Sequence, residues 1–327
     1  MKKLCFIQRL KVKDRDKPIL SICCITFNHK NYINKTIEGF LLQKTNFKIE
    51  IIIHDDASTD GTSGIVREFA NKDSRIIPIL RKTNIKSSGV PVFPITYQKA
   101  KGNYIALCEG DDYWTDPLKL QKQVDFLEKH KDYSLCCGDF ETLYDTNKWK
   151  NEIRINHISD DKIKKGFSFG LNEIKDQWIT KSLTVVFRRE LLRSLDFVNF
   201  NYFRDVHLIY HLLKQGRGYY FKQNFGFYRI HEGGIHSMTS KLNYLYSSYL
   251  IYKELYEKNN DDFTRYKYLK HIIMLFRYIL YRQKTEKIII DKYNLLKEIL
   301  ALIKTKEEYV KLIKAFSPRS VIYELVK

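Results

Sequence analysis

The sequence predicts an α/β fold built on a parallel sheet, and three observations support this class. Short apolar runs rich in β-branched residues recur through the first 140 residues, as is typical of strands buried on both faces. Segments with helical spacing of apolar residues separate these runs, and such alternation builds right-handed βαβ units. Polar and acidic residues directly follow several of the runs, which is where doubly wound sheets place their ligands.

Five strands are expected in this part of the chain. Pro78 lies inside the third run and places that strand at an edge of the sheet, because proline cannot donate a hydrogen bond to a neighbouring strand. The runs cover residues 19–26, 48–55, 75–80, 103–108 and 133–140.

The segments between the strands predict helices. The first has apolar residues at positions i, i+4 and i+7 counted from Ile33, which form one face. The second begins with Asp60 or Thr62 as its N-cap, because both side chains can accept a hydrogen bond from the first turn. The third begins near Pro117, since proline fits the first turn of a helix.

The pattern is less regular up to about residue 200 and helical beyond residue 241. Four further elements are expected before the helical tail. They are a strand at 183–187, a helix from Arg188, a helix at 204–216 and a strand at 219–230.

Composition limits the class of partner and the cellular setting. The 327 residues include 57 Lys or Arg and 38 Asp or Glu, which gives a formal charge of +19 and favours an anionic partner. No nucleic-acid-binding module is recognisable, so we expect no nucleic-acid partner. The six cysteines fall mostly in apolar runs, which favours buried, reduced thiols and a cytoplasmic location. Neither a signal peptide nor a run of about 18 apolar residues is present, so the expected protein is soluble or peripheral to a membrane.

The sharpest chemical signal is the acidic turn after the fourth strand, where Glu109, Asp111 and Asp112 lie within four residues. Neighbouring carboxylates repel one another, and a divalent cation supplies the missing counter-charge through oxygen ligands. Mg²⁺ and Mn²⁺ typically bind one or two carboxylates together with substrate phosphates. A solvated acidic turn is the alternative. Trp114 follows and either stacks on a sugar ring or packs in the core.

Four segments together resemble glycosyltransferase family 2. They are PILSICCITFNH, IEIIIHDDASTDGT, AKGNYIALCEGDDYW and, later, YRIHEGG, and they lie in the family's order over about residues 18–235. The resemblance implies a GT-A type fold, a Rossmann-like mixed sheet flanked by helices and followed by a C-terminal helical region. It also implies a nucleotide-sugar donor and a reaction that generally inverts the anomeric carbon.

The resemblance also suggests how the chain is divided. A basic extension covers residues 1–17, the GT-A catalytic domain covers 18–240, and a basic amphipathic helical region covers 241–327. Within the catalytic domain, residues 18–140 form the half that binds the nucleotide-sugar and residues 141–240 the acceptor half.

By this resemblance, the end of the first strand and the end of the second strand bind the nucleotide. Thr26, Phe27 and Asn28 frame it. Asp55 or Asp56 accepts a hydrogen bond from the uracil or the ribose, and the choice between the two stays open.

The resemblance places the donor diphosphate near the acidic turn. Asp111 contacts the ribose or the metal, and Asp112 binds the metal that bridges the diphosphate. Arg229 binds the diphosphate, because a guanidinium can contact phosphate oxygens bidentately. His231 completes the metal shell or contacts a phosphate. Glu109 stands where the family often has Asp, so its role stays open.

The catalytic base is expected on the acceptor side. By the resemblance, Asp205 at the start of the helix at 204–216 takes the proton from the acceptor hydroxyl. The alternative is a carboxylate that only complements the helix dipole. Arg204 stands where the family usually has Glu. Trp178 and Thr184 are expected to shape the acceptor site, with Trp114 in the sugar pocket.

The expected reaction moves a hexose or N-acetylhexosamine from a nucleotide diphosphate, a UDP-sugar, to a saccharide or lipid-linked acceptor, with Mn²⁺ or Mg²⁺ as cofactor. The setting would be surface polysaccharide assembly, with the tail helices docked on anionic lipids at the inner face of the plasma membrane. Simple packing of the apolar helix faces against one another is the alternative. A metal-dependent phosphohydrolase or phosphoacceptor domain with Asp55 as nucleophile is the competing function, although it leaves TFNH, YRIHEGG and Asp205 unexplained.

Overall fold

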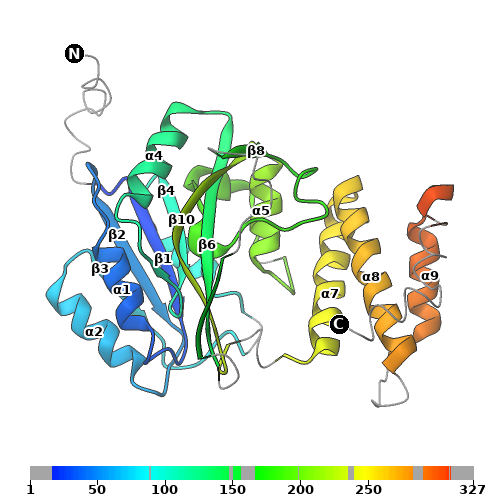
Figure 1. Cartoon of the computed structure of the whole chain (residues 1–327), viewed down its shortest axis with the longest axis horizontal. Helices are drawn as coiled ribbons and strands as arrows, with labels where there is room; N and C mark the ends of the chain where they lie inside the picture. The colour runs from blue at the N-terminus through cyan, green and yellow to red at the C-terminus, as the bar shows by residue number, and fades with distance from the viewer. Residues whose placement is uncertain are drawn as a thin grey trace. The chain divides into compact units, whose positions relative to one another are not determined.

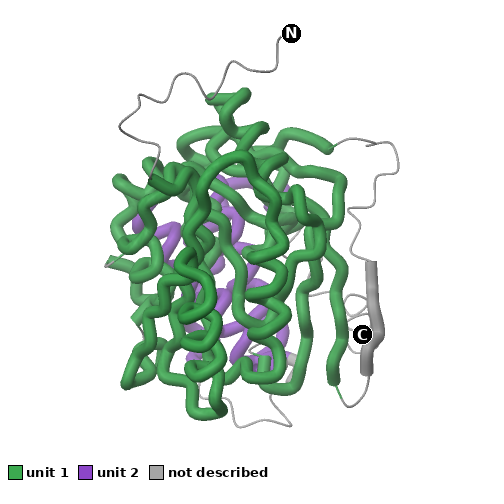
Figure 2. Tube along the Cα trace, turned by 90° about the vertical axis from the view of Figure 1, so that its left-hand side faces the viewer, with its two compact units in different colours: residues 1–237 green, residues 238–327 purple. Residues whose placement is uncertain are grey.

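The chain consists of two compact units, Met1–Ser237 and Met238–Lys327, which Figure 2 colours separately. The computed structural model describes residues 17–87, 90–146, 150–155, 166–197, 199–234, 239–282, 290–308 and 310. All of the expected N-terminal extension except Lys17 lies outside these residues. The assignment of a catalytic domain ending at residue 240 stays a prediction.

Strands and helices alternate in the first part of unit 1, as the sequence predicts (Figure 1). In chain order they are β1 (Leu20–Thr26), α1 (Ile33–Leu41), β2 (Ile49–Asp55), α2 (Thr62–Lys72), β3 (Ile76–Leu80), α3 (Phe93–Lys99), β4 (Tyr104–Glu109), β5 (Tyr113–Trp114), α4 (Lys119–Lys129) and β6 (Tyr133–Asp145). The five predicted strands β1, β2, β3, β4 and β6 are confirmed, each beginning within one residue of its expected start. The sequence pattern does not predict α3 or β5.

The rest of unit 1 adds strands that the sequence predicts only in part. They are β7 (Lys150–Ile155), β8 (Phe167–Phe169), β9 (Val186–Arg188) and β10 (Arg217–His231), with the 3₁₀ helices η3 (Ser182–Thr184) and η4 (Arg189–Ser194) and the helix α5 (Asp205–Leu213). The helix predicted from Arg188 is wrong at its start and in its type. Arg188 ends β9 because its buried guanidinium donates to backbone carbonyls of Leu127, His130 and Tyr133, and only a 3₁₀ helix follows.

Ten strands of the described residues form one mixed sheet, with the main order β3-β2-β1-β4-β9-β6-β10-β5. Strands β3, β2, β1 and β4 are parallel, whereas β9 runs antiparallel between β4 and β6. The edge position of β3 confirms the expectation from Pro78. The mixed sheet therefore combines four parallel strands, β3, β2, β1 and β4, with an inserted antiparallel strand, β9.

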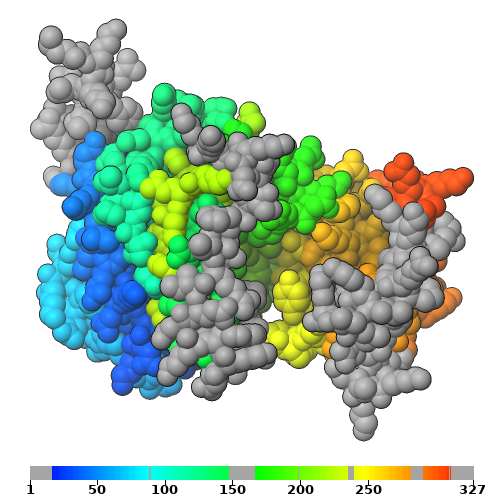
Figure 3. Space-filling view, in the orientation of Figure 1, coloured from blue at the N-terminus to red at the C-terminus, as the bar shows by residue number. Residues whose placement is uncertain are grey.

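Helices cover both faces of this sheet. Side chains of α1, α2 and α4 form one core with alternate residues of β1, namely Leu20, Ile22 and Cys24. Helix α3 packs on β1 and β2 from the other face, and α5 packs on β6. On the side drawn in Figure 3, atoms of the first strand–helix unit (blue), the β4–α4 segment (teal) and β10 (yellow-green) lie next to one another. Segments far apart in sequence thus meet on one side of unit 1.

The start of α2 differs from the expected cap. Gly61 occupies the N-cap position with a φ of 103°, a conformation that suits glycine. Asp60 acts from one residue earlier, where its carboxylate accepts from the backbone N–H groups of Thr62 (3.0 Å) and Lys30 (2.9 Å). Asp60 therefore ties the loop after β1 to the first turn of α2.

Unit 2 is helical, as expected for the part of the tail that the structure describes. Its helices are α7 (Lys241–Asn259), α8 (Asp262–Arg282) and α9 (Lys292–Leu302). They pack in sequence, and Glu298 of α9 links them, since it accepts from Lys253 (2.9 Å) and Tyr249 (3.0 Å) of α7 and from Tyr268 of α8. Among the described residues, no helix has the length and hydrophobicity needed to cross a bilayer.

Candidate active site

The candidate site lies where the parallel strands β1, β2 and β4 end together. The register pairs Thr26 with Asp55 and Ile25 with Glu109, so the polar segments after the three strands share one edge of the sheet. The N–H of Asp56 donates to the carbonyl of Thr26 (3.0 Å), and the N–H of Gly110 donates to that of Ile25 (2.8 Å). The carboxyl ends of these strands therefore lie together, as the sequence predicts.

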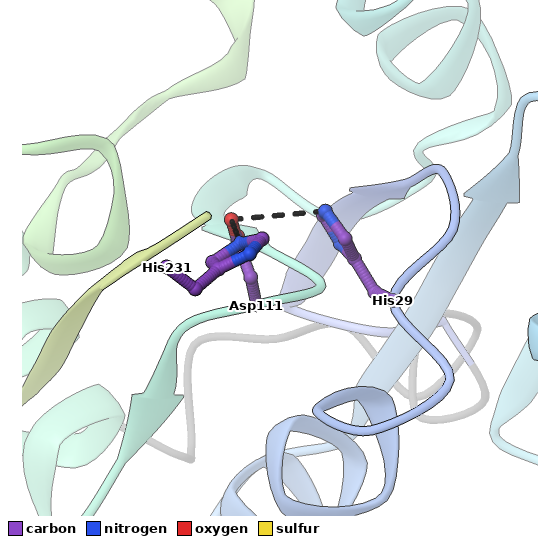
Figure 4. A group of neighbouring side chains, drawn as sticks. All are labelled: His29, Asp111 and His231. Carbon is purple, nitrogen blue, oxygen red and sulfur yellow. Dashed lines mark hydrogen bonds and ion pairs between the residues drawn. The ribbon is translucent and has the colours of Figure 1, made fainter. Parts of the chain in front are cut away.

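Three side chains from separate elements meet at this edge (Figure 4). The Asp111 Oδ2 atom lies 3.2 Å from Nε2 of His231 and 3.7 Å from Nε2 of His29. His29 comes from the loop after β1, Asp111 from the turn after β4, and His231 from the last position of β10. One donor atom from each lies within 4.8 Å of the other two. Two imidazole nitrogens and a carboxylate oxygen are a suitable donor set for a divalent cation.

The charges of this group affect one another. Burial works to raise the pKa of Asp111, but the hydrogen bond from His231 and the charge of His29 outweigh it and hold that pKa below its usual value. Burial lowers the pKa of His29, with Asp111 opposing the change. An Asp111 that keeps its negative charge is what cation binding requires.

Asp112, expected as the principal metal ligand, lies outside this group. The side chain is 3% exposed, and its Oδ1 atom accepts from the backbone N–H of Arg229 at 2.8 Å. Burial, together with the charges of Asp111 and Glu109, raises the pKa of Asp112 well above its usual value. The placement corrects the sequence expectation, because Asp112 holds β10 against the acidic turn rather than facing the two histidines.

Glu109, the last residue of β4, is half-buried. Burial and the charge of Asp111 raise the pKa of Glu109 to about 7, and Asp205 adds to the effect. The charges of Lys86 and Lys181 oppose it. The carboxylates of Asp111 and Asp205 are therefore near enough to Glu109 to disfavour its negative charge.

Two residues position the acidic turn: Thr36, which the sequence analysis does not identify, and Gly110, whose lack of a side chain the tight turn requires. The Thr36 hydroxyl lies 2.6 Å from the carbonyl oxygen of Asp112 and 2.9 Å from that of Gly110. A Cβ atom at Gly110 would lie 2.5 Å from Oγ1 of Thr26 and 3.0 Å from Nδ1 of His29, so only glycine fits. The available signal for Thr36 is a lone polar residue on the otherwise apolar buried face of α1.

Arg229 lies beside the acidic turn, and its binding to a diphosphate stays a prediction. Its Nε donates to the backbone carbonyl of Asp111 at 2.9 Å. The guanidinium carbon lies 4.5 Å from the ring centroid of Tyr32 and 5.5 Å from that of Tyr113. These contacts fix a positive charge next to the group of His29, Asp111 and His231.

The segment Thr26–Phe27–Asn28 begins the loop that carries His29. Thr26 is buried, Phe27 is 40% exposed, and Asn28 has a φ of 55°. The Asn28 side chain accepts from the N–H of Thr59 at 2.9 Å, which joins this loop to the one after β2. Phe27 is thus an exposed ring at the candidate nucleotide end of the site.

Asp55 and Asp56 are both buried and both bonded within the protein. Asp55 accepts from the hydroxyls of Ser58 and Ser63. Asp56 accepts from the N–H groups of Ile85 and Lys86, each at 3.0 Å. Each carboxylate therefore positions a loop, and the choice between them as base-binding residue stays open.

Asp205 is half-buried at the first position of α5. At the start of this helix the backbone N–H of Arg204 donates to Nδ1 of His207 at 3.1 Å, and the backbone N–H of Val206 donates to Oδ1 of Asp205 at 2.9 Å. His207 and Asp205 therefore both bond to the backbone at the first turn. Burial raises the pKa of Tyr228, and the charges of Asp112, Glu109, Asp111 and Asp205 add to this effect.

Two of the residues expected in the sugar or acceptor pocket are core residues instead. Trp114 is 2% exposed, packs on Phe40 with ring centroids 4.8 Å apart, and donates from its indole N–H to the carbonyl of Leu183 at 2.6 Å. Thr184 is fully buried, and its hydroxyl donates to the carbonyl of Lys181 at 3.1 Å. Both expectations are corrected, because neither side chain is accessible to a sugar. Trp178 is half-buried and stays a candidate.

This arrangement of sheet and site defines the class of protein, a glycosyltransferase domain of the GT-A type. Residues 21–195, more than half of the chain, match the family model described as glycosyl transferase family 2. The chain belongs to glycosyltransferase family 2.

Curated relatives match a smaller part of the chain. Mb1547 of Mycobacterium bovis is 46% identical over 136 residues, which cover 41% of this chain and 38% of that protein. WfaP of Escherichia coli, a UDP-Glc:α-D-GlcNAc-diphosphoundecaprenol β-1,3-glucosyltransferase, is 41% identical over 113 residues, or 35% of this chain and 43% of WfaP. The chain thus spans about two fifths of the length of these relatives.

Solved structures share the fold at low identity. Staphylococcus aureus TarS in complex with UDP aligns with a TM-score of 0.54 and 17% identity, covering 92% of this chain and 82% of that one. The mannosyltransferase PcManGT of Pyrobaculum calidifontis, in complex with GDP-Man and Mn²⁺, aligns with a TM-score of 0.52 and 13% identity, covering 91% and 84%. At these identities the likeness concerns the fold.

Proposed function

We propose that the chain transfers a hexose or N-acetylhexosamine from a UDP-sugar to a hydroxyl group of a saccharide or lipid-linked saccharide, with inversion, in surface polysaccharide assembly. The observation that carries the proposal is the convergence of Asp111, His231 and Arg229 at the carboxyl ends of the parallel strands. The named activity of WfaP, a UDP-glucose transferase acting on a diphosphoundecaprenol-linked sugar, supports this choice of substrates.

The donor half of the site would bind the nucleotide and its diphosphate. Asp111 and His231 would hold a divalent cation, Mn²⁺ or Mg²⁺, and such an ion would supply positive charge to stabilise the leaving diphosphate. Arg229 adds a second positive charge at the diphosphate. Asp112 keeps Arg229 in place through its backbone contact.

The nucleotide would lie along the ends of β1 and β2. Phe27 and Asn28 contact it directly, while buried Thr26 shapes the turn below. Asp55 or Asp56 supplies the acceptor for the base or ribose.

The acceptor half would supply the base. Asp205 accepts the proton of the attacking hydroxyl as that oxygen displaces the nucleoside diphosphate from the anomeric carbon. Trp178 borders the acceptor. The competing phosphohydrolase function needs Asp55 as a nucleophile, but both of its carboxylate oxygens already accept from serine hydroxyls.

A panel of nucleotide sugars, each with and without Mn²⁺, tests the function by thermal shift. UDP-sugars with Mn²⁺ should stabilise the full chain by about 2.7 kcal/mol at about 100 times their Kd. Product formation with a saccharide or polyprenyl-diphosphate-linked acceptor then identifies the transfer. Failure of every nucleotide sugar to stabilise the chain would contradict the proposal, and a covalent aspartyl-phosphate would support the phosphohydrolase instead.

We further propose that unit 2 docks on the anionic inner face of the plasma membrane. Supporting this, α9 exposes Tyr293, Leu296 and Leu300 at i, i+3 and i+7, next to the exposed Lys297. The full chain should co-sediment with vesicles containing phosphatidylglycerol and not with neutral vesicles, and L296Q/L300Q should reduce binding. Equal binding to neutral vesicles, or no binding to either, would refute the docking.

A further inference from the structure

Of the three residues in the group of His29, Asp111 and His231, His29 is the one to which the sequence analysis assigns no role in metal binding. It precedes Asp111 by 82 residues and His231 by 202, and only the fold brings the three together. Figure 4 shows His29, in the loop after β1, facing Asp111 from one side, with the ring of His231 overlapping Asp111 in this view. Their ring centroids are 5.9 Å apart, and the rings are nearly perpendicular.

The loop holds His29 in a fixed position. Its backbone N–H donates to Oγ1 of Thr62 at 2.9 Å, which anchors the loop to the first turn of α2. The side chain is only 14% exposed, and the absence of a Cβ at Gly110 leaves the ring room on that side. A residue held from two sides in this way can present one ring nitrogen to a ligand with little loss of entropy.

The ring nitrogens of His29 are poorly satisfied by the protein. The Nδ1 atom is buried and has no hydrogen-bond partner among the described residues. The Nε2 atom faces Oδ2 of Asp111 at 3.7 Å, which is too long for a hydrogen bond. A buried imidazole in this state calls for an explanation, and a bound cation between Nε2 and Asp111 is one.

We propose that His29 is a third protein ligand of the divalent cation, so that two imidazole nitrogens and one carboxylate oxygen bind it. This donor set selects a transition-metal ion such as Mn²⁺ over Mg²⁺, since Mg²⁺ prefers oxygen ligands and nitrogen donors favour the transition metals. The inference rests on the proposed function only for the cation's place beside the donor diphosphate. Metal binding by the chain alone is a separate property.

Metal binding is measured on the full chain without nucleotide, by calorimetry with Mn²⁺, Co²⁺ and Mg²⁺ and by Co²⁺ absorption. The unaltered chain should bind Co²⁺ and Mn²⁺ more tightly than Mg²⁺. H29A should weaken Mn²⁺ binding by at least about tenfold, because even indirect partners of metal ligands contribute that much. H29Q tests the same ligand with a larger side chain. Circular dichroism of the metal-free variants checks that they fold.

His130 provides the matched control. It lies between the last residue of α4 and the start of β6. Because β6 runs parallel to β4, the start of β6 is at the opposite end of the strands from the carboxyl ends of β1 and β4. H130A should bind Mn²⁺ and Co²⁺ as the unaltered chain does. Pulsed electron paramagnetic resonance of Mn²⁺ bound to the unaltered chain needs no variant, and we expect couplings to two imidazole nitrogens.

Each outcome decides the inference. A single imidazole coupling, unchanged Mn²⁺ binding by folded H29A, or equal affinity for Mg²⁺ and Mn²⁺ would overturn it. If sugar transfer occurs but His29 does not bind metal, the proposed function stands and this inference falls. If the metal binds through two imidazoles but no nucleotide sugar binds, the proposed function falls and this inference stands.

Discussion

Replacing Asp205 by Asn should lower kcat for sugar transfer by about 10²–10⁴-fold, the usual contribution of a general base. Asparagine keeps the size and polarity of the side chain but cannot take the proton from the acceptor hydroxyl. The helix start should survive, because His207 still accepts from the backbone N–H of Arg204, and the side-chain oxygen of asparagine can still accept from the N–H of Val206. Steady-state kinetics and calorimetric titration with the donor measure the two effects separately.

Donor affinity distinguishes a base from a donor-binding residue. In D205N the Kd for the UDP-sugar should stay within about threefold of the original value, since the carboxylate is assigned to the acceptor side. The exposed Glu190, in the first turn of η4, offers a charge-matched control, and E190Q should leave both quantities unchanged. A parallel loss of donor affinity and rate in D205N would assign Asp205 to the donor instead.

Replacing Lys119 by Met should raise the free energy of unfolding at pH 7 by about 3 kcal/mol. The Lys119 side chain is fully buried on α4, and its Nζ has no hydrogen-bond partner among the described residues. Burial lowers the pKa of Lys119 from 10.5 to about 7. That change in pKa corresponds to about 5 kcal/mol of lost stability at neutral pH. The Nζ of Lys119 lies 4.0 Å from the ring centroid of Trp114, and this cation–π contact offsets about 2 kcal/mol of the loss. Methionine fills the same space without a charge.

The pH dependence follows from the direction of this shift. Between about pH 7 and 10.5 the unfolded chain holds a proton on Lys119 that the folded chain lacks, so stability rises with pH. Four neighbouring titratable groups oppose the lowering of the Lys119 pKa, namely Cys108, Cys136, Asp116 and Cys137. The three thiols are themselves buried. In K119M the part of the rise in stability with pH that comes from Lys119 should disappear.

Urea unfolding from about pH 6 to about pH 10 measures both effects, and the exposed Lys129 on the same helix is the control. K129M should change the stability by less than about 0.5 kcal/mol. A K119M protein less stable than the original at pH 7 would mean that the amine has a partner worth more than its burial costs.

The parallel strands of the first part of the chain could be predicted because burial on both faces demands continuous apolar runs. β1, β2 and β4 are such runs, and Pro78 correctly places β3 at the edge. β5 could not be predicted, because its two residues become a strand only by pairing with β10, where Trp114 faces Gly226. The pairing depends on residues more than one hundred positions away.

Trp114 shows where the composition of a motif misleads. An aromatic residue after an acidic turn suits a sugar pocket and a core equally well. The carbonyl of Leu183, which accepts from its indole N–H, and the ring of Phe40 place it in the core. Neither partner is near it in sequence, so only the packed fold decides.

The sequence by itself determined the family, the parallel strand ends and the acidic turn that follows β4. It could not determine which carboxylate of that turn faces the histidines. Neighbouring residues in an extended turn point in different directions, so Asp111 meets His231 while Asp112 binds the backbone of β10. Nor could it bring His29 to the site, because that approach depends on the parallel register of β1 and β4. Local pattern sets which side chains are available, and long-range packing sets which of them meet.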